Sequence, residues 1–190
     1  MKKLRPFYPA DQLQAMYGGV YDPNRWPEHT LRLQRTGEIV QELVNRHDLR
    51  SIADFSCGDG SIVHGLKMFH DASFLMTDVG KGDPPIEDQV LTMPFTDLFI
   101  CTETIEHLEA PWTVLEYAAM RARYVVLSTP LDEDPAIGNY EHYWSFTQWD
   151  VATLLHQSGF SEDQKFESLT RAGWTYEYQI WTARSKYFGA

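Results

Sequence analysis

The chain has 190 residues, of which 43% are hydrophobic and 14% aromatic, enough to bury the core of one domain. Its 16 Lys and Arg residues are outnumbered by 27 Asp and Glu residues spread along the sequence, for a net charge of -11. A surface of this charge repels polyanions on average, which argues against broad contact with duplex DNA. Two cysteines do not make a disulfide framework, and no apolar run reaches about 18 residues. We therefore expect a reduced, cytoplasmic protein that is neither secreted nor membrane-spanning.

The first half of the chain alternates between helical and strand patterns. Residues 1–28 contain four prolines and two glycines among many aromatic residues, which predicts an irregular arm with one short helix. Apolar residues at helical spacing predict an amphipathic helix over residues 29–46. The following segments predict a buried strand, the glycine turn CGDG, a helix and a second strand, over residues 51–56, 57–60, 61–69 and 73–79.

The second half continues the alternation. We expect a weak strand, a buried strand, a helix and another strand near residues 88–92, 97–103, 108–122 and 124–130. A loop, a helix ended by Gly159 and two last strands follow, over residues 131–144, 147–160, 164–170 and 174–184. The pattern predicts an α/β fold with a doubly wound, mostly parallel seven-stranded sheet, an antiparallel edge hairpin at Ala172-Gly173 and helices on both faces. Residues 1–28 would form an aromatic arm or lid on a domain of residues 29–190.

A nucleoside-binding crevice is predicted where the first strands end. Gly58 and Gly60 permit a tight turn after Asp54, so that the backbone can approach a ligand closely before a helix begins. About twenty residues later, Asp78 ends the second predicted strand, where a carboxylate can accept hydrogen bonds from both hydroxyls of a ribose. The alternative is that the glycines only turn the chain and that Asp78 is a solvated residue.

The segment Asp54-Phe-Ser-Cys-Gly-Asp-Gly60 resembles the first motif of class I S-adenosylmethionine-dependent methyltransferases, an acid followed by G-x-G-x-G, with Ser56 in place of the first glycine. The resemblance extends over roughly residues 35–184. It implies a Rossmann-like fold with S-adenosylmethionine as cofactor. It also implies that Asp78 contacts the ribose of the cofactor and that Asp88 or Gln89 contacts the adenine. Further cofactor contacts are implied along the motif, from Asp54, Ser56, Cys57, Gly58 and Gly60, and at the end of the next strand, from Thr102.

A candidate metal site follows the buried strand. Glu103, Glu106 and His107 stand at relative positions 0, 3 and 4, so on a helix all three would project from one face, and His142 would supply a fourth ligand. Two carboxylates and one or two imidazoles suit Mg, Mn, Fe, Co or Zn. The pattern E-x-x-E-H with a later H-x-W-x-F-T is similar to two metal-dependent groups, the small-RNA 3′-terminal 2′-O-methyltransferases and the ubiquinone-pathway catechol O-methyltransferases. Both recognise adjacent hydroxyls.

Plainer interpretations remain for each of these residues. The two glutamates complement a helix dipole equally well, and without a metal His107 or His142 would be a general base. Several residues near the N-terminus have two interpretations, and they are Tyr8, Tyr17, Tyr21, Trp26, His29 and Arg32. They either bury an edge of the sheet or, by the family resemblance, close over cofactor and substrate. A patch around Arg25, Arg32 and Arg35 is an alternative site for a short nucleotide or a phosphate.

These observations predict an S-adenosylmethionine-dependent methyltransferase that transfers the methyl group to oxygen of a small hydroxylated molecule such as a sugar, a catechol or a natural-product precursor. We expect Glu106, His107 and His142 to be the catalytic residues, assisted by Mg, Mn or Zn. Two alternatives are an RNA 2′-O-methyltransferase, which the charge disfavours, and a non-catalytic cofactor-binding module. The sequence does not determine the oligomeric state, and a homo-oligomer is one alternative.

Overall fold

The computed structural model describes residues 1–17, 28–67, 71–136, 141–171, 173–174 and 176–188. The helices are α1 Ala10–Tyr17, α2 His29–His47, α3 Ser61–Lys67, η1 Val79–Lys81, α4 Ile86–Thr92, α5 Pro111–Ala119 and α6 Gln148–Ser158. The strands are β1 Lys2–Lys3, β2 Ser51–Asp54, β3 Ser73–Met76, β4 Thr96–Thr102, β5 Ala122–Leu131, β6 Trp144–Ser145, β7 Glu162–Leu169 and β8 Glu177–Arg184. None of the helices in these ranges is both long and apolar enough to cross a membrane.

The central sheet has the strand order β3-β2-β4-β5-β8-β7. The first four strands run parallel, with β2 and β4 in register at Ile52 and Leu98, and β8 is antiparallel to both β5 and β7. The α/β class, the mostly parallel sheet and the antiparallel edge hairpin are therefore confirmed. The chain order reverses between β2 and β4, and in sheets of this kind ligands bind at such a switch point, beyond the carboxyl ends of the strands.

One predicted strand is wrong. The residues near 88–92 lie in helix α4, so the sheet has six strands in the described part of the chain instead of seven. Ile86 and Val90 stand one helical turn apart and are both buried, with Pro85 directly before the helix. A spacing of four puts two apolar residues on one face of a helix and equally on one face of a strand, so it does not distinguish the two. The segment was too short for its period to be decisive.

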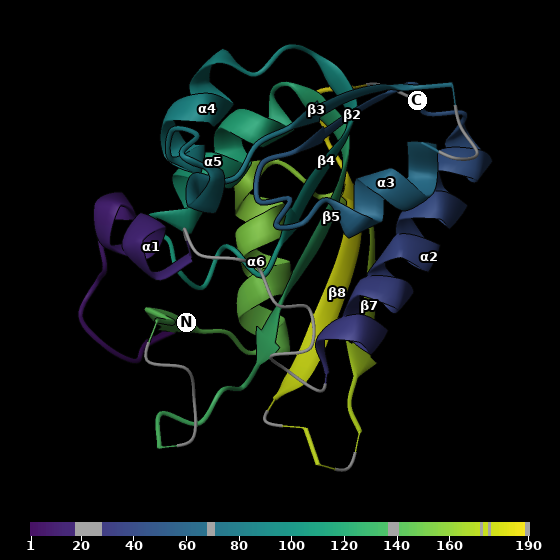
Figure 1. Cartoon of the computed structure of the whole chain (residues 1–190). Coiled ribbons are helices and arrows are strands. Elements are labelled where there is room, and N and C mark those ends of the chain that lie inside the picture. The colour runs from purple at the N-terminus through teal and green to yellow at the C-terminus, as the bar shows by residue number, and fades with distance from the viewer. Residues whose placement is uncertain (18–27, 68–70, 137–140, 172, 175, 189–190) are drawn as a thin grey trace.

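Helices cover both faces of the sheet (Figure 1). Helices α2 and α3 lie on one side, and α4, α5 and α6 lie on the other. A hydrophobic core lies on each face of the sheet, and neighbouring residues of β4 belong to different cores. Phe99 packs on the α4–α6 side and Ile100 on the α2–α3 side, and both are fully buried. This alternation is the period-two geometry of a strand that is buried on both faces.

The N-terminal segment packs against parts of the chain that are distant in sequence. Strand β1 pairs with β6, with Lys2 opposite Ser145 and Lys3 opposite Trp144, and Leu4 N donates to Tyr143 O at 2.9 Å. Helix α1 contacts η1, which follows β3. The described part of the predicted arm, residues 1–17 and 28, therefore contains one short helix, and residues 1–17 lie beside the loops at the carboxyl edge of the sheet (Figure 1).

Two glycines in helices allow a matched test of backbone strain. Gly159 ends α6 at a φ of 108°, a conformation that side chains strain, whereas a Cβ on Gly37 inside α2 would meet nothing within 4 Å. We expect Gly159→Ala to lower the free energy of unfolding by about 1–2 kcal/mol and Gly37→Ala to raise it by about 0.5–1 kcal/mol. Urea unfolding followed by circular dichroism measures both, and equal effects would contradict the assignment of the α6 end.

Candidate functional site

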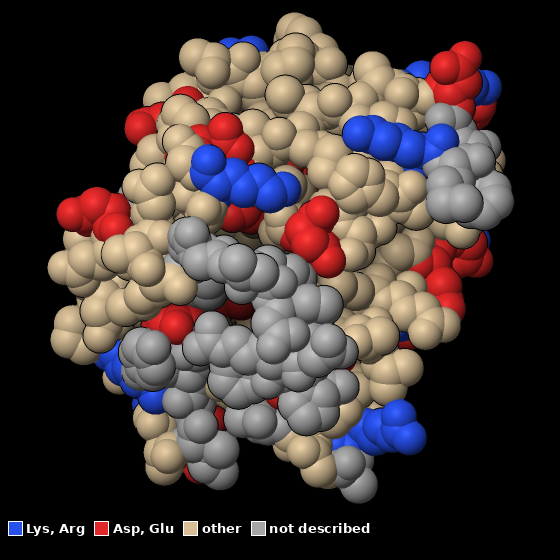
Figure 2. All heavy atoms as spheres, viewed as in Figure 1, with Lys and Arg blue, Asp and Glu red and all other residues tan. Residues whose placement is uncertain are grey.

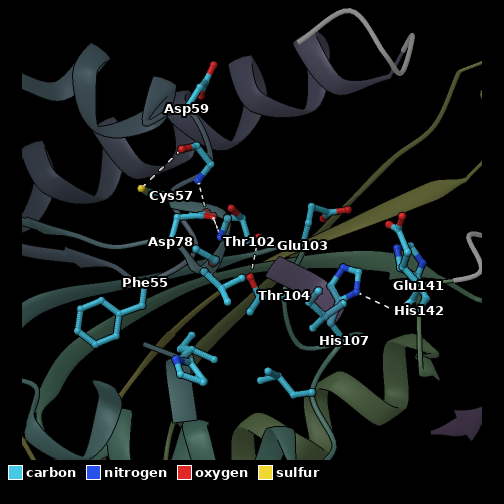
Figure 3. Close-up of a pocket in the computed structure, with 18 of the residues that line it drawn as sticks. Phe55, Cys57, Asp59, Asp78, Thr102, Glu103, Thr104, His107, Glu141 and His142 are labelled. Carbon is cyan, nitrogen blue, oxygen red and sulfur yellow. Dashed lines mark hydrogen bonds between the residues drawn. The ribbon is translucent and has the colours of Figure 1, made fainter. Parts of the chain in front are cut away.

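A cavity of about 510 Å³ opens at the carboxyl ends of β2, β3 and β4, at the predicted edge of the sheet. Figure 2 shows the surface hollowed near the middle of this face, with basic and acidic side chains at the edge of the hollow. Figure 3 shows that Cys57, Asp59 and Asp78 lie at one end of the cavity and that His107 and His142 lie at the other, with Thr102 and Glu103 between them. Both predicted sites therefore share one cavity.

The glycine turn has a left-handed backbone that favours glycine, and at Gly60 it leaves no room for a side chain. Gly58 and Gly60 have φ values of 53° and 83°, and a Cβ on Gly60 would lie 2.6 Å from Met76 Cε. Gly60 N donates to Cys57 O at 2.7 Å, which closes the turn before α3. Only a residue without a side chain allows this close approach of β3 to the turn.

Asp78 is the N-cap of η1 and anchors the glycine turn. Its Oδ2 accepts from Gly58 N at 2.7 Å, and its Oδ1 accepts from Gly80 N at 2.8 Å. These bonds fix the orientation of the carboxylate at the wall of the cavity. Each carboxylate oxygen has a second lone pair, so the group can still accept hydrogen bonds from ligand hydroxyls.

The predicted cofactor residues divide into two groups. Ser56, Cys57, Gly58, Asp78 and Thr102 line the cavity. Asp54, Gly60, Asp88 and Gln89 are not among its lining residues.

The side chains around these positions explain the division. Gln89 Nε2 donates to Pro84 O, and the first turn of α4 presents Ile86 and Glu87 to the cavity instead. Glu87 is one position from the predicted residue, and burial raises its pKa. Ser56 Oγ is buried and makes no hydrogen bond within the described ranges, which suits it to a ligand.

Asp54 is a buried acid under the turn. It is 1% exposed, and burial raises its pKa to about 7, while Ser56 N donates weakly to Oδ1 at 3.4 Å.

Cys57 differs from Asp54 in its position, because it lines the cavity. Burial raises the pKa of its thiol to about 11, and Lys81 Nζ lies 3.4 Å from its Sγ. Both Cys57 and Cys101 are free and buried.

The predicted helix carrying Glu103, Glu106 and His107 is wrong, because residues 103–109 form turns. Glu103 has a φ of 51°, which bends the chain away from the direction of β4. Its Oε1 accepts from Ser128 Oγ at 2.8 Å and lies 3.8 Å from Arg32 Nη1. The turns nevertheless keep Glu106 beside His107, and of these two residues His107 lines the cavity whereas Glu106 is buried behind the lining.

Glu106, His107 and His142 converge, with one potential ligand atom from each lying within 4.8 Å of the others. The two imidazole centroids are 4.9 Å apart in an edge-to-face arrangement. Glu106 Oε2 accepts from Thr129 Oγ1 at 2.9 Å, and its Oε1 is buried without a hydrogen-bond partner in the described part of the chain. Glu103, the other predicted ligand, is not in this group.

The protonation of the three groups follows from burial. Burial lowers the pKa of His107 to about 3 and the pKa of His142 to about 4, so both imidazoles are neutral at neutral pH. Burial and the nearby Glu103 raise the pKa of Glu106 well above its usual range. Neutral imidazoles are metal ligands, whereas a pKa near 3 or 4 makes a weak general base at pH 7.

Arg32 was grouped in the sequence with a phosphate-binding patch, but it faces inward from α2. It is 6% exposed and lines the cavity, whereas Arg35 pairs with Glu38 and Glu167, and Arg25 lies outside the described residues. Arg32 Nη2 contacts His29 Nδ1 at 3.0 Å. Its Nη1 is buried without a hydrogen-bond partner in the described ranges, so it is available to an acceptor atom of a ligand.

Of the predicted arm, Phe7 and Leu13 line the cavity together with His29 and Arg32. Phe7 packs edge-to-face on Tyr143 at 5.6 Å. Tyr8 and Tyr17 are not lining residues, and Tyr21 and Trp26 lie outside the described residues. The sequence missed Phe7, Leu13, Glu87, Tyr176 and Tyr178 as cavity residues, since they come from four separate segments.

Solved structures share this architecture. The N-terminal domain of EvdMO1 with S-adenosylhomocysteine bound has a TM-score of 0.64 at 12% identity, over 95% of this chain and 98% of that one. The 1,6-didemethyltoxoflavin-N1-methyltransferase of Burkholderia thailandensis, also with S-adenosylhomocysteine, has a TM-score of 0.65 at 16% identity, over 95% and 92%. This chain has the fold of S-adenosylmethionine-dependent methyltransferases. No family model and no curated protein matches the sequence.

The fold by itself does not fix the reaction. The cyclase SpnF matches with a TM-score of 0.66 at 11% identity, over 95% of this chain and 98% of that one. Unrelated activities are known to share a fold, so the activity has to be argued from the side chains of the cavity.

Asp54 allows a pH test of the buried turn. Its pKa of about 7 in the folded state exceeds the ordinary value of 3.8, so ionisation in the unfolded state increasingly favours unfolding between these pH values. Asp54→Asn removes this pH-dependent loss of stability. We expect the stability gain of the variant over the wild type to be larger at pH 8 than at pH 5.5 by about 2 kcal/mol. Urea unfolding of the protein without ligand measures the gain, and an equal gain at both pH values would refute a buried, neutral Asp54.

Proposed function

We propose that the protein is an S-adenosylmethionine-dependent methyltransferase that methylates an oxygen atom of a small hydroxylated molecule with the help of a divalent cation. The observation that carries this proposal is that both predicted sites lie in the same cavity of about 510 Å³. One end has the glycine turn and Asp78, and the other has two neutral imidazoles beside a buried carboxylate. A methyl donor at the first end faces an acceptor held at the second.

The first end fits the donor in three ways. Gly58 leaves room for a ligand against the backbone, and Ser56 Oγ needs a hydrogen-bond partner. Asp78 is oriented to accept from ribose hydroxyls, and Glu87 can accept from an adenine amino group. S-adenosylmethionine supplies a methyl group activated by a sulfonium. The residues of this chain bind it and hold its direction toward the acceptor.

The second end fits a cation. One carboxylate and two imidazoles form a donor set found around Zn, and the nitrogen donors favour Zn or Mn over Mg. The buried Glu106 Oε1 makes no hydrogen bond in the described ranges, so a ligand atom of suitable charge is available there. Glu103 is a candidate fourth ligand, but Ser128 and Arg32 contact its carboxylate. A bound divalent cation supplies Lewis-acid activation of a substrate hydroxyl.

The remaining chemistry is positioning. The residues of the two ends fix the acceptor oxygen in line with the donor methyl group, and such alignment is worth roughly 7–11 kcal/mol of barrier in favourable cases. The two histidines are better suited to holding a cation than to removing a proton, because their pKa values of about 3 and 4 make them weak bases. We therefore assign Glu106, His107 and His142 as ligands first.

The acceptor is expected to be small and not strongly anionic. Glu87, Glu103 and Glu141 line the cavity, and carboxylates at this density repel a polyanion. EvdMO1 has also been solved in the presence of S-adenosylhomocysteine and D-fucose, so a monosaccharide is a sensible first probe. The same charge argument places an RNA 2′-O-methyltransferase second. A cofactor-binding module without activity is excluded by methyl transfer to any acceptor.

Removing two ligands tests the metal. We expect the double variant Glu106→Ala with His107→Ala to bind Mn²⁺ at least about 100-fold more weakly and to lose methyl transfer, because both a carboxylate and an imidazole are absent. Its affinity for S-adenosylhomocysteine should stay unchanged, since His107 lies at the end of the cavity away from the glycine turn and Glu106 is clustered with it.

Calorimetry gives both affinities, and a radiolabelled methyl donor with a panel of monosaccharides and catechols gives the rate. Near-normal turnover of this variant would refute the proposed role of the metal. A wild-type protein that binds neither S-adenosylmethionine nor S-adenosylhomocysteine would refute the proposed methyltransferase function.

Arg32 tests the donor end. The α-carboxylate is the one anionic group of S-adenosylhomocysteine, and Arg32 Nη1 is a buried donor at the wall of the same cavity. We propose that this guanidinium binds the carboxylate. Arg32→Met should then weaken S-adenosylhomocysteine binding by about tenfold or more, as expected for a lost charged hydrogen bond.

The variant should leave the affinity for 5′-methylthioadenosine unchanged, because that ligand lacks the amino-acid part. Arg35→Met, three residues along α2 and paired with Glu167 instead, is the matched control. Equal losses for both ligands would show a general disturbance of the cavity in place of carboxylate recognition.

A further inference from the structure

Glu133 is a buried acid that is not one of the three clustered ligands. It lies in the loop after β5, and its side chain is 1% exposed. Its Oε2 lies 2.5 Å from His142 Nδ1, within hydrogen-bond distance, and the imidazole it contacts is itself buried. Burying a carboxylate is costly, so a chain that keeps one here gains something from it.

We propose that Glu133 is a positioning residue for the cation site: it fixes the protonated nitrogen of His142 and thereby the nitrogen that His142 presents to a metal. This inference rests on the proposed function. An ionised carboxylate can only accept, so a neutral His142 must have its proton on Nδ1 to make this bond, and its lone pair is then on Nε2. Ligating histidines ordinarily make such a bond through the nitrogen that does not bind the metal.

His107 makes the equivalent arrangement with a different partner. Its Nδ1 lies 3.1 Å from Glu141 O, a carbonyl that can only accept. Both rings of the cluster are therefore oriented through Nδ1, one by a backbone carbonyl and one by a carboxylate. The carboxylate is the stronger of the two constraints, because a charged acceptor makes a shorter and stronger hydrogen bond than a neutral one.

The N-terminal segment holds this pair from the outside. Arg5 Nη1 lies 3.9 Å from Glu133 Oε1, and Arg5 Nη2 donates to Pro135 O at 3.3 Å. Leu4 N donates to Tyr143 O, one residue after His142, and β1 pairs with β6 immediately beyond it. The first five residues thus contact both sides of the loop that carries Glu133 and His142.

Cation binding by the full chain tests the proposal. We expect Glu133→Gln, which keeps the shape but loses the charge, to lower the affinity for Mn²⁺ by about 10–100-fold, the range seen when a partner of a ligating histidine is lost. Glu133→Asp, which keeps the charge, should recover part of that loss. Asp134→Asn is the matched control, because Asp134 is the exposed acid next in sequence and its Oδ1 bonds only the local Ala136 N among the contacts described.

Two further measurements separate a positioning role from a structural one. The affinity for S-adenosylhomocysteine should be unchanged in all these variants, because the glycine turn is at the other end of the cavity. Nitrogen-15 spectra of the imidazoles at pH 7.5, assigned with His142→Ala, should show His142 protonated on Nδ1 in the wild type and a mixture of both forms in Glu133→Gln.

Each outcome decides a separate point. If Glu133→Gln binds Mn²⁺ as tightly as Asp134→Asn does, or if wild-type His142 has its proton on Nε2, the positioning role is overturned. If the wild type binds no Mn²⁺ at all, the proposed metal site fails. The nitrogen spectra need no metal, so in that case an Nδ1 proton that depends on Glu133 still establishes the positioning of His142 by this carboxylate.

Discussion

The carbonyl oxygen of Glu106 accepts two backbone hydrogen bonds, from Tyr143 N at 2.7 Å and from Trp144 N at 3.0 Å, and the arrangement of the cluster depends on them. They join the turn after β4 to the loop after β5, which brings His142 against His107. Ordering such a loop costs conformational entropy. Burial of Tyr143, Trp144 and Phe146 in the core offsets that cost, and the indole of Trp144 also donates to Leu108 O.

The sheet makes this junction possible. Because β4 and β5 are parallel neighbours, their carboxyl ends meet at one edge, and the loops that follow them start side by side. The same rule brings the ends of β2 and β3 to this edge and places the glycine turn at the opposite end of the cavity from the imidazoles (Figure 3). A candidate cofactor crevice and a cluster of candidate ligands are thus consequences of one strand order.

The sequence predicted the features that depend on local chemistry. The spacing of the apolar residues predicted α2, residues 97–103 were correctly predicted as the buried strand β4, and Gly159 was correctly read as the end of α6. Gly58 and Gly60 were predictable as a turn because glycine adopts the left-handed backbone of tight turns most readily, and both have a positive φ. Glu106, His107 and His142 were identified by residue type and spacing, and the structure brings these three together.

Features that depend on contacts between distant segments were not predictable. Residues 88–92 were assigned to a strand because seven residues give too short a record of the period. The left-handed backbone of Glu103 has no sequence signal, so its separation from the cluster was missed. Arg32 and Glu133 gain their roles from partners far away in the chain, and single-sequence patterns do not record such partners.

The charges of the cluster support the proposal that a cation binds there. Three carboxylates near the imidazoles are buried, those of Glu106, Glu133 and Glu141, and the side chain of Glu103 is 19% exposed. Both imidazoles are neutral at pH 7. Arg32 lies 3.8 Å from Glu103 and Arg5 lies 3.9 Å from Glu133, whereas Glu106 has no ion-pair partner in the described part of the chain. A buried carboxylate in that position either keeps a proton, which its raised pKa expresses, or pairs with a cation. Replacing the proton by a divalent ion would pair the Glu106 carboxylate with a cation and use both imidazoles, which supports the cation site proposed above.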